Sequence, residues 1–225
     1  MREICLDTET TGLDPRDGHK IIEIACVELV NKVKTGNHFH AYINPRREVG
    51  AEAFKIHGIS NEFLADKPIF AHIADKFLDF IADAKLVIHN AAFDMKFINF
   101  ELGLIGRGPI YSDNVVDSLI LARKMFPGAQ NSLDALCKRF GVDLSKRIKH
   151  GALLDSELLA DVYIELMGGS QVNLGLEITK NNIDSLQNEK EKKIIKSRNF
   201  ELSEKEIEEH KDFVKKNIKN NIWQF

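Results

Sequence analysis

The first part of the chain alternates hydrophobic and polar residues with the two-residue period of β-strands. The alternation runs through REICLDTE (residues 2–9), KIIEIACVELV (20–30) and HFHAYINP (38–45), and it predicts three strands. TTGLDPRDGH (10–19) contains Gly and Pro and predicts a loop, while KTGN (34–37) predicts a tight turn. Three consecutive strands with a short final turn indicate an antiparallel meander.

The period then changes to that of amphipathic helices. ISNEFLADKP (59–68) is helical in character, and apolar residues recur at three- and four-residue spacing in IFAHIADKFLDFIADA (69–84). Further elements are expected in KLVIHN (85–90, a buried strand), MKFINFELGL (95–104, a helix), YSDNVVDSLILARKMF (111–126, a strand and a helix), SLDALCKRFG (132–141, a helix) and GALLDSELLADVYIELMGG (151–169, a helix). This order predicts an α/β domain over residues 1–168 with a mixed sheet flanked by helices.

The C-terminal part of the chain has a different composition. Residues 169–200 are rich in Asn, Lys, Glu and Gln, and they predict a flexible linker. An ordinary surface extension of the domain is the alternative. Residues 201–225 predict a short helix that begins with the capping box of Ser203 and Glu206. One face of this helix has the apolar residues Ile207, Val214, Ile218 and Ile222.

Composition narrows the class of protein. The net charge of −3 argues against a protein that coats long nucleic acid by bulk electrostatics. No apolar run approaches the length of a membrane span, and the N-terminus lacks an apolar signal core, so we expect a soluble protein. Cys5, Cys26 and Cys137 are odd in number and far apart, and they predict buried thiols in a reducing cytoplasm.

Two acidic residues lie close together at the end of the first predicted strand. Asp7 and Glu9 are two residues apart, so the strand period places both side chains on one face of the sheet. Carboxylates held side by side repel each other unless a positive charge lies between them. A divalent metal at the strand end explains the pair, although an accidental spacing with one side chain in solvent is the alternative.

Asp94 follows the buried strand in the stretch HNAAFD (89–94). Asp94 could simply cap the following helix, but Asn90 is available as the cap. If the strand at 85–90 lies beside the first strand, both strands bring acids to one edge of the sheet. Ligand crevices of α/β sheets commonly lie at such strand ends.

HGALLD (150–155) adds His150 and Asp155. Asp155 falls on the turn of the last helix that would face the sheet, and His150 precedes the helix on a more mobile stretch. This arrangement suits one fixed ligand and one group that moves over the site. A histidine that is only part of the surface is the alternative.

Asp, Glu, Asp, His and Asp in these contexts resemble the DEDDh 3′–5′ exonucleases. The resemblance covers residues 1 to about 168, and five matching positions show no departure. It is carried by LDTETTGL (6–13), KIHGIS (55–60), LVIHNAAFD (86–94) and HGALLD (150–155). It implies a ribonuclease H-like mixed five-stranded sheet, in agreement with the order of elements above.

The resemblance also implies a mechanism with two Mg²⁺ or Mn²⁺ ions at the scissile phosphate. Asp7 would bridge both ions, Glu9 and Asp155 would hold the ion that binds the attacking water, and Asp94 would support the second ion. Hard cations of this kind prefer oxygen ligands. His150 would be the general base.

Substrate contacts are implied by the same motifs. The expected contacts are the metal-binding Asp7, Glu9 and Asp155 together with Thr8, Thr10, Leu13, His57 and Phe93. For Leu13 and Phe93, packing in the core is the alternative. The implied substrate is the single-stranded 3′ end of DNA, from which a mispaired terminal nucleotide is removed at a replicative polymerase.

The tail predicts partners. Residues 201–225, with Trp223 and Phe225 as aromatic anchors, would tether the nuclease to a polymerase subunit. Docking of the helix on its own domain is the alternative. QVNLGL (171–176) resembles a degenerate sliding-clamp motif, in which Gln171 precedes spaced apolar residues.

Two other functions compete with this interpretation. A stand-alone 3′ exonuclease for RNA or small oligonucleotides would share the site, but such enzymes usually end near the last catalytic helix. A non-catalytic scaffold that links replication proteins would keep the fold, but it would not require all five site residues. Metal-dependent nucleotide release distinguishes the scaffold from both enzymes.

Overall fold

A five-stranded sheet with the order β3-β2-β1-β4-β5 forms the centre of the N-terminal part of the protein. The strands are β1 (Arg2–Thr10), β2 (Ile21–Val30), β3 (Val33–Tyr42), β4 (Lys85–Ile88) and β5 (Val115–Asp117). β1 pairs antiparallel with β2, and β2 with β3, whereas β4 is parallel to both β1 and β5. The predicted meander and mixed sheet are therefore confirmed.

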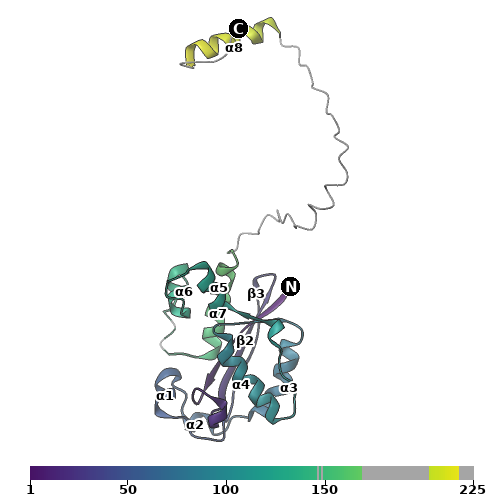
Figure 1. The fold of residues 1–225 in the computed structure, drawn as a ribbon, viewed down its shortest axis with the longest axis vertical. Coiled ribbons are helices and arrows are strands. Elements are labelled where there is room, and N and C mark those ends of the chain that lie inside the picture. The colour runs from purple at the N-terminus through teal and green to yellow at the C-terminus, as the bar shows by residue number, and fades with distance from the viewer. Residues whose placement is uncertain (146, 148, 169–202, 218–225) are drawn as a thin grey trace. The chain divides into compact units, whose positions relative to one another are not determined.

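The computed structural model describes residues 1–145, 147, 149–168 and 203–217 (Figure 1). The chain divides into two compact units, Met1–Leu174 and Gly175–Phe225, and each is described by itself. The predicted linker at 169–200 and the predicted clamp motif at 171–176 lie outside the described residues. The same is true of four tail residues named above: Ile218, Ile222, Trp223 and Phe225.

The turn between β2 and β3 differs from the prediction. KTGN was the expected turn, but residues 34–37 belong to β3, and the chain reverses at Asn31 and Lys32. These two residues have φ of 51° and 65°, which is the left-handed conformation that a two-residue hairpin turn requires. Gly36 lies within the strand instead, next to a register shift between Val27 and Leu29.

Helices cover both faces of the sheet (Figure 1). The even-numbered residues of β1, Ile4 and Leu6, pack with α3 (Phe70–Ile81) and α4 (Ala91–Leu104) in one core. The odd-numbered Cys5 packs on the other face, in a cluster with residues of α7 (Ala152–Leu166). The strand period thus divides β1 between two cores.

The remaining helices surround this framework. The bounds are α1 (Ala51–His57), α2 (Asn61–Leu64), α5 (Ser118–Met125), α6 (Leu133–Phe140), α7 (Ala152–Leu166) and two short 3-10 helices, Pro15–Asp17 and Ser112–Asn114. The helix expected over 59–68 is short because only α2 forms there, after the Ser60 cap. α1 was not predicted. Cys5, Cys26 and Cys137 are buried free thiols, as expected.

The start of α4 corrects a second expectation. Asn90 occupies the cap position in the left-handed conformation, with φ of 68°, but its side chain makes no capping hydrogen bond. The carboxylate of Asp117 accepts hydrogen bonds from the backbone N–H of Asn90 at 3.3 Å and of Ala91 at 3.0 Å. Asp117 also caps α5 through Leu119 and Ile120. One carboxylate therefore satisfies the first N–H groups of two helices.

The C-terminal unit contains α8 (Glu204–Asn217). The predicted capping box is present, because the Glu206 carboxylate accepts from the N–H of Ser203 at 2.9 Å and the Ser203 hydroxyl accepts from the N–H of Glu206. Val214 is 1% exposed, whereas Ile207 is 38% exposed. Within the described part of the chain, none of the helices has the length and apolar character needed to span a membrane.

Candidate active site

The end of β1 places two carboxylates beside the parallel strand β4. The register pairs Leu6 with Ile88, the last residue of β4, so Asp7 and Glu9 continue β1 just beyond that pairing. Both residues are odd-numbered, and their side chains share the face on which α7 packs. The expected common face is confirmed by this register. Asp7 is partly exposed, and Glu9 is 9% exposed.

Asp94 reaches the same strand end from the first turn of α4. Its Oδ1 accepts hydrogen bonds from the hydroxyl of Thr8 at 2.6 Å and from the backbone N–H of Thr8 at 3.1 Å. Asp94 is 4% exposed. The alternative in which Asp94 serves as the helix cap is therefore wrong, because its carboxylate accepts from Thr8 on β1 and Asp117 caps α4.

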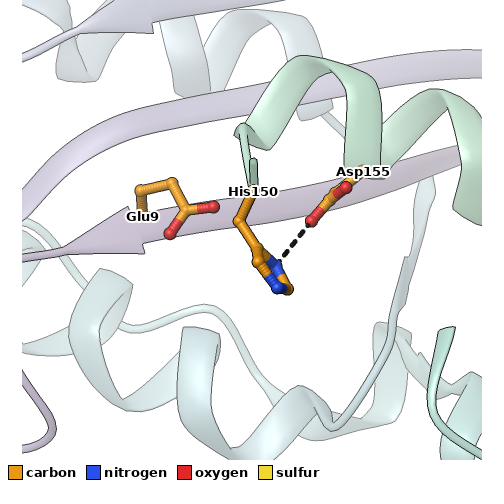
Figure 2. Close-up of side chains that lie close together, drawn as sticks. All are labelled: Glu9, His150 and Asp155. Carbon is orange, nitrogen blue, oxygen red and sulfur yellow. Dashed lines mark hydrogen bonds and ion pairs between the residues drawn. The ribbon is translucent and has the colours of Figure 1, made fainter. Parts of the chain in front are cut away.

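Glu9, His150 and Asp155 converge from three segments (Figure 2). Each offers one ligand atom, and these atoms all lie within 4.8 Å of one another. Asp155 lies in the first turn of α7, and its side chain is 4% exposed, whereas the side chain of His150 is 50% exposed. Nδ1 of His150 is 3.1 Å from Oδ2 of Asp155, the interaction dashed in Figure 2. Asp155 is thus buried on α7 and His150 is more accessible, while their roles as fixed ligand and moving group stay predictions.

Arg147 is an unpredicted member of the site. Its Nε lies 2.6 Å from Oδ1 of Asp155, and its Nη2 lies 2.7 Å from Oδ2, so the guanidinium binds the carboxylate with two parallel hydrogen bonds. Its Nη1 also contacts Asp134. Nη2 is 2.9 Å from Nδ1 of His150, so this nitrogen faces a donor on Arg147 and an acceptor on Asp155. Only the tautomer with a proton on Nδ1 can donate to Asp155.

Glu23 is a further acid that the sequence interpretation overlooked. It lies opposite Glu9 in the β1–β2 register and is 2% exposed. One oxygen of Glu23 is 2.7 Å from Nε2 of His40, and the other accepts from the N–H of Ala152 at 3.1 Å. Glu23 therefore connects the sheet to the first residue of α7, the helix that holds Asp155.

The carboxylates raise one another's pKa values. Burial raises the pKa of Asp7 well above its ordinary value, and the negative charges of Asp94 and Glu9 raise it further. Burial, followed by the charges of Asp155 and Glu23, raises the pKa of Glu9 to about 8. These acids lose their protons readily only when a positive charge joins them.

For two of the acids, hydrogen bonds oppose the effect of burial on the pKa. Burial raises the pKa of Asp94 to about 7 although its hydrogen bonds with Thr8 act to lower it. Burial would also raise the pKa of Asp155, but the hydrogen bonds from Arg147 and His150 outweigh it and lower that pKa. Asp155 is thus the acid whose negative charge the protein itself neutralises.

This donor set fits divalent cations. It consists of carboxylate oxygens and one imidazole, which suit hard or borderline ions such as Mg²⁺ and Mn²⁺. The raised pKa values of Asp7, Glu9 and Asp94 show that positive charge is needed to stabilise their ionised forms. Arg147 forms ion pairs with Asp155 and Asp134, and its charge lowers the pKa of Glu9 less than burial and the neighbouring acids raise it.

A cavity of about 770 Å³ adjoins the acids on the side of α1. The expected substrate contacts Thr8, Thr10, Leu13, His57 and Phe93 all line it. Leu13 is 82% exposed, so the core-packing alternative is wrong for this residue. Phe93 also packs against the core, where its ring lies 5.2 Å from that of Phe97. The hydroxyls of Thr8 and Thr10 are already engaged, with Asp94 and with the carbonyl of Gly12.

His57 has an unusual hydrogen-bonding state. Its Nδ1 accepts from the N–H of Ile59 at 3.0 Å, so the neutral ring has its proton on Nε2. Nε2 is buried and has no partner among the described residues. Burial lowers the pKa of His57, which keeps the ring neutral. A buried N–H without a partner is costly, and a ligand acceptor in the adjoining cavity would remove that cost.

A second cavity of about 500 Å³ opens on the other side of the acids. Asp7, Arg147, His150 and Asp155 form one wall, and the opposite wall comes from α5 and α6 and includes Arg123. Asp7 and Asp155 therefore line one cavity and Glu9 lines the other, so both cavities border the acidic cluster.

The overlooked residues had weak signals in the sequence. Glu23 is a charged residue inside the apolar strand KIIEIACVELV, and Arg147 lies three residues before His150. Neither signal shows which acid the residue would contact. That information depends on the strand register and on the path of the segment before α7.

Known proteins similar to this chain agree with the geometry. A family model described as exonuclease matches residues 4–163. The chain is 54% identical over 221 residues to the DNA polymerase III subunit epsilon of Rickettsia typhi, and the match covers 96% of each protein. It is 55% identical over 175 residues to the DNA polymerase III subunit epsilon of Escherichia coli K12, with 75% of this chain and 72% of that protein covered.

Among solved structures, the nuclease domain of 3′hExo, a DEDDh family member bound to rAMP, has a TM-score of 0.65 to this chain. The match covers 74% of this chain and 91% of that domain at 20% sequence identity. At this identity the likeness establishes the fold, and it confirms the predicted ribonuclease H-like sheet.

We predict that Glu9→Gln stabilises the protein at high pH when divalent ions are chelated. The pKa of Glu9 is about 8 in the folded protein against an ordinary value of 4.5, so the folded state binds the extra proton and stability falls as pH rises between these values. Glutamine removes this loss, and we expect the free energy of unfolding to rise by on the order of 1–3 kcal/mol at pH 8.5. Urea denaturation in EDTA measures it.

The gain should nearly vanish at pH 5, where Glu9 is protonated in the folded protein. Glu157→Gln, which neutralises an exposed acid on α7, is the matched control and should change stability little at either pH. An equal gain from Glu9→Gln at both pH values would contradict the role of charge repulsion.

Proposed function

Because the chain belongs to the DEDDh exonuclease family, among the DNA polymerase III epsilon subunits, we propose that it removes mispaired 3′-terminal nucleotides from DNA. The reaction is hydrolysis of the terminal phosphodiester by a 3′–5′ exonuclease that uses divalent metal ions. The proposed ions are two Mg²⁺ or Mn²⁺, and the proposed site is the cluster of four carboxylates and His150.

One observation carries this proposal. Acids from β1, α4 and α7 meet at a single edge of the sheet, directly beside a cavity of about 770 Å³ that holds the expected nucleotide contacts. Repulsion among the acids makes the cluster unfavourable as a purely structural feature. A metal-dependent reaction at a nucleotide end accounts for both the acids and the cavity.

The four carboxylates would hold the ions. The charges of Asp94, Glu9 and Asp155 all raise the pKa of Asp7, so Asp7 would be the acid shared by both ions. Glu9 and Asp155 would hold one ion, and Asp94 would support the other. When bound, such ions activate a water molecule and stabilise the leaving 3′ oxygen. The hydrogen bonds from Thr8 fix Asp94, and those from Arg147 fix Asp155, so both acids are oriented in advance.

His150 is the proposed general base. If its Nδ1–H donates to Asp155, the lone pair of Nε2 is free to accept a proton from the attacking water. The half-exposed ring lines the cavity of about 500 Å³, from which it can approach a water molecule. Asp155 then serves two purposes, because it holds an ion and orients the imidazole.

Selection of errors follows from the size and shape of the nucleotide cavity rather than from base readout. A mispaired 3′ terminus costs less to unpair than a matched one, so a cavity that admits only unpaired nucleotides favours errors. Exposed Leu13 and the ring of His57, both in the lining of the cavity, are the groups that would meet the terminal nucleotide.

We predict that nucleotide release from a 3′-labelled primer requires this site. Asp7→Asn should reduce release below detection because it removes the shared ligand, and His150→Ala should reduce turnover by roughly 10²- to 10⁴-fold. EDTA should abolish release, and Mg²⁺ or Mn²⁺ should restore it. Rates on matched DNA, mismatched DNA and RNA primers measure these effects and the substrate preference together.

His72→Ala, which removes an exposed histidine on α3, is the control and should leave the rate unchanged. Faster release from RNA than from mismatched DNA would favour the alternative of a stand-alone 3′ exonuclease for RNA or small oligonucleotides. No release with either ion would leave the scaffold as the better explanation.

Assembly with a polymerase follows from the family, and the tail is the proposed means. We propose that residues 201–225 bind the DNA polymerase III alpha subunit, with Trp223 and Phe225 as anchors. The support is a capped helix, α8, in a unit of its own, and a relative from Rickettsia typhi that matches 96% of the chain. A tether raises the local concentration of the nuclease at the primer end.

We predict that removal of residues 201–225 abolishes co-purification with the alpha subunit but leaves nucleotide release intact. Trp223→Ala with Phe225→Ala should weaken binding by at least tenfold, as expected for aromatic anchors. Pull-down and binding titrations measure this. Full retention of the truncated protein by the alpha subunit would contradict the tether.

The segment from Gln171 to Leu176 is the proposed contact with a sliding clamp. We predict that Gln171→Ala with Leu174→Ala lowers retention of the nuclease on clamp-loaded DNA and does not alter nucleotide release without the clamp. Gln187→Ala, another glutamine of the predicted linker, is the control. Unchanged retention of the double variant on clamp-loaded DNA would contradict this proposed contact.

A further inference from the structure

Helix α1 borders the nucleotide cavity with one of its faces. Ala51, Ala53, Ile56 and His57 line that cavity together with the loop that follows β1. Ala53 also packs against a core cluster formed with Ile22. The position of α1 therefore determines the shape of the space that a terminal nucleotide would enter.

The segment that holds His150 docks on the end of the same helix. The backbone N–H of His150 donates to the carbonyl of Ile56 at 3.3 Å, which lies in the last turn of α1. Carbonyl groups there have no partner within the helix. The general base is thus bonded through its backbone to the helix that lines the nucleotide cavity.

Lys149 strengthens this contact. Its Nζ lies 5.1 Å from the centre of the Phe54 ring, within the range of a cation–π interaction. A cation at the C-terminal end of a helix is also electrostatically favourable. The Phe54 ring is 41% exposed and lies on α1.

Gly58 makes room for the lysine side chain. Gly58 ends α1 with φ of 73°. A Cβ atom at this position would lie 2.7 Å from Cδ of Lys149 and 2.8 Å from its Nζ. The lysine therefore lies directly across the end of the helix, and it can do so because residue 58 has no side chain.

We propose that Lys149 is a positioning residue that acts through His150. By lying over Phe54 and across Gly58, it fixes the segment before α7 on α1 and so places the imidazole. Because α1 lines the nucleotide cavity, the base is held in position by the same helix that meets the terminal nucleotide. This inference rests on the proposed role of His150 as the general base.

A direct role of the Lys149 charge in attracting DNA is the competing explanation. The two explanations predict different effects of removing Lys149 when His150 is absent. A positioning residue loses its effect when the group that it positions is removed, whereas attraction of DNA persists without the imidazole. A double-mutant cycle measures this difference.

The experiment uses the full chain in single-turnover reactions on a mismatched DNA primer with Mg²⁺. We expect Lys149→Ala to lower the rate at saturating enzyme by about 3- to 30-fold, with half-saturation changed less than about twofold. Lys149→Arg, which keeps the cation–π contact, should restore most of the rate. Lys55→Ala, an exposed lysine on the same helix, should behave like the unmodified protein.

The deciding comparison is Lys149→Ala in the His150→Ala background, where we expect a further change below about twofold. A further loss as large as that in the unmodified background would overturn the proposal in favour of a direct contact with DNA. A wild-type rate in Lys149→Ala, with His150→Ala impaired, would overturn this proposal alone. A wild-type rate in His150→Ala would instead overturn the proposed base.

Gly58→Asn gives an independent test. Asparagine tolerates the left-handed conformation, but its side chain would occupy the position of Lys149. We expect the same reduced rate as in Lys149→Ala, and no further loss when both changes are combined. Losses that multiply in the combined variant would show that the two residues do not act through one contact.

Discussion

Repulsion among closely placed carboxylates, most of them buried, is the constraint around which the site is built. Asp7, Glu9, Asp94 and Asp155 come from three elements and are forced together by the register of β1 and the packing of α4 and α7. The sheet and its two cores must supply the free energy that holds these charges close. The site is therefore a region where the fold favours ion binding and reaction at the expense of stability.

The central strand makes this arrangement possible. β1 lies in the middle of the sheet and is hydrogen-bonded on both sides. Its even-numbered residues, Ile4 and Leu6, anchor it in one core, and its odd-numbered Asp7 and Glu9 project toward α7. The two-residue period of the strand thus places the hydrophobic anchors on one face and the candidate metal ligands on the other. Thr8, between the two acids, faces the other way and orients Asp94.

The sequence was sufficient for the features that depend on local periodicity. It predicted the meander, the two later strands of a mixed sheet and the common face of Asp7 and Glu9, because each follows from residue spacing and the order of elements. Combined motifs identified the five candidate site residues. The turn was misplaced from Asn31 and Lys32 to KTGN because glycine is only one way to reach a positive φ. Arg147, Glu23 and the double cap Asp117 could not be predicted, since their partners lie on distant elements.

The different anchoring of the acids and the histidine has a thermal consequence. Amides of a central strand such as β1 become accessible to solvent only when the whole sheet opens. In the described residues, His150 is held by one backbone hydrogen bond of 3.3 Å and by contacts of its half-exposed ring with Asp155 and Arg147. Such a segment opens locally at much lower free energy. Warming would therefore displace the histidine before the sheet melts, and we expect heat inactivation to precede global unfolding.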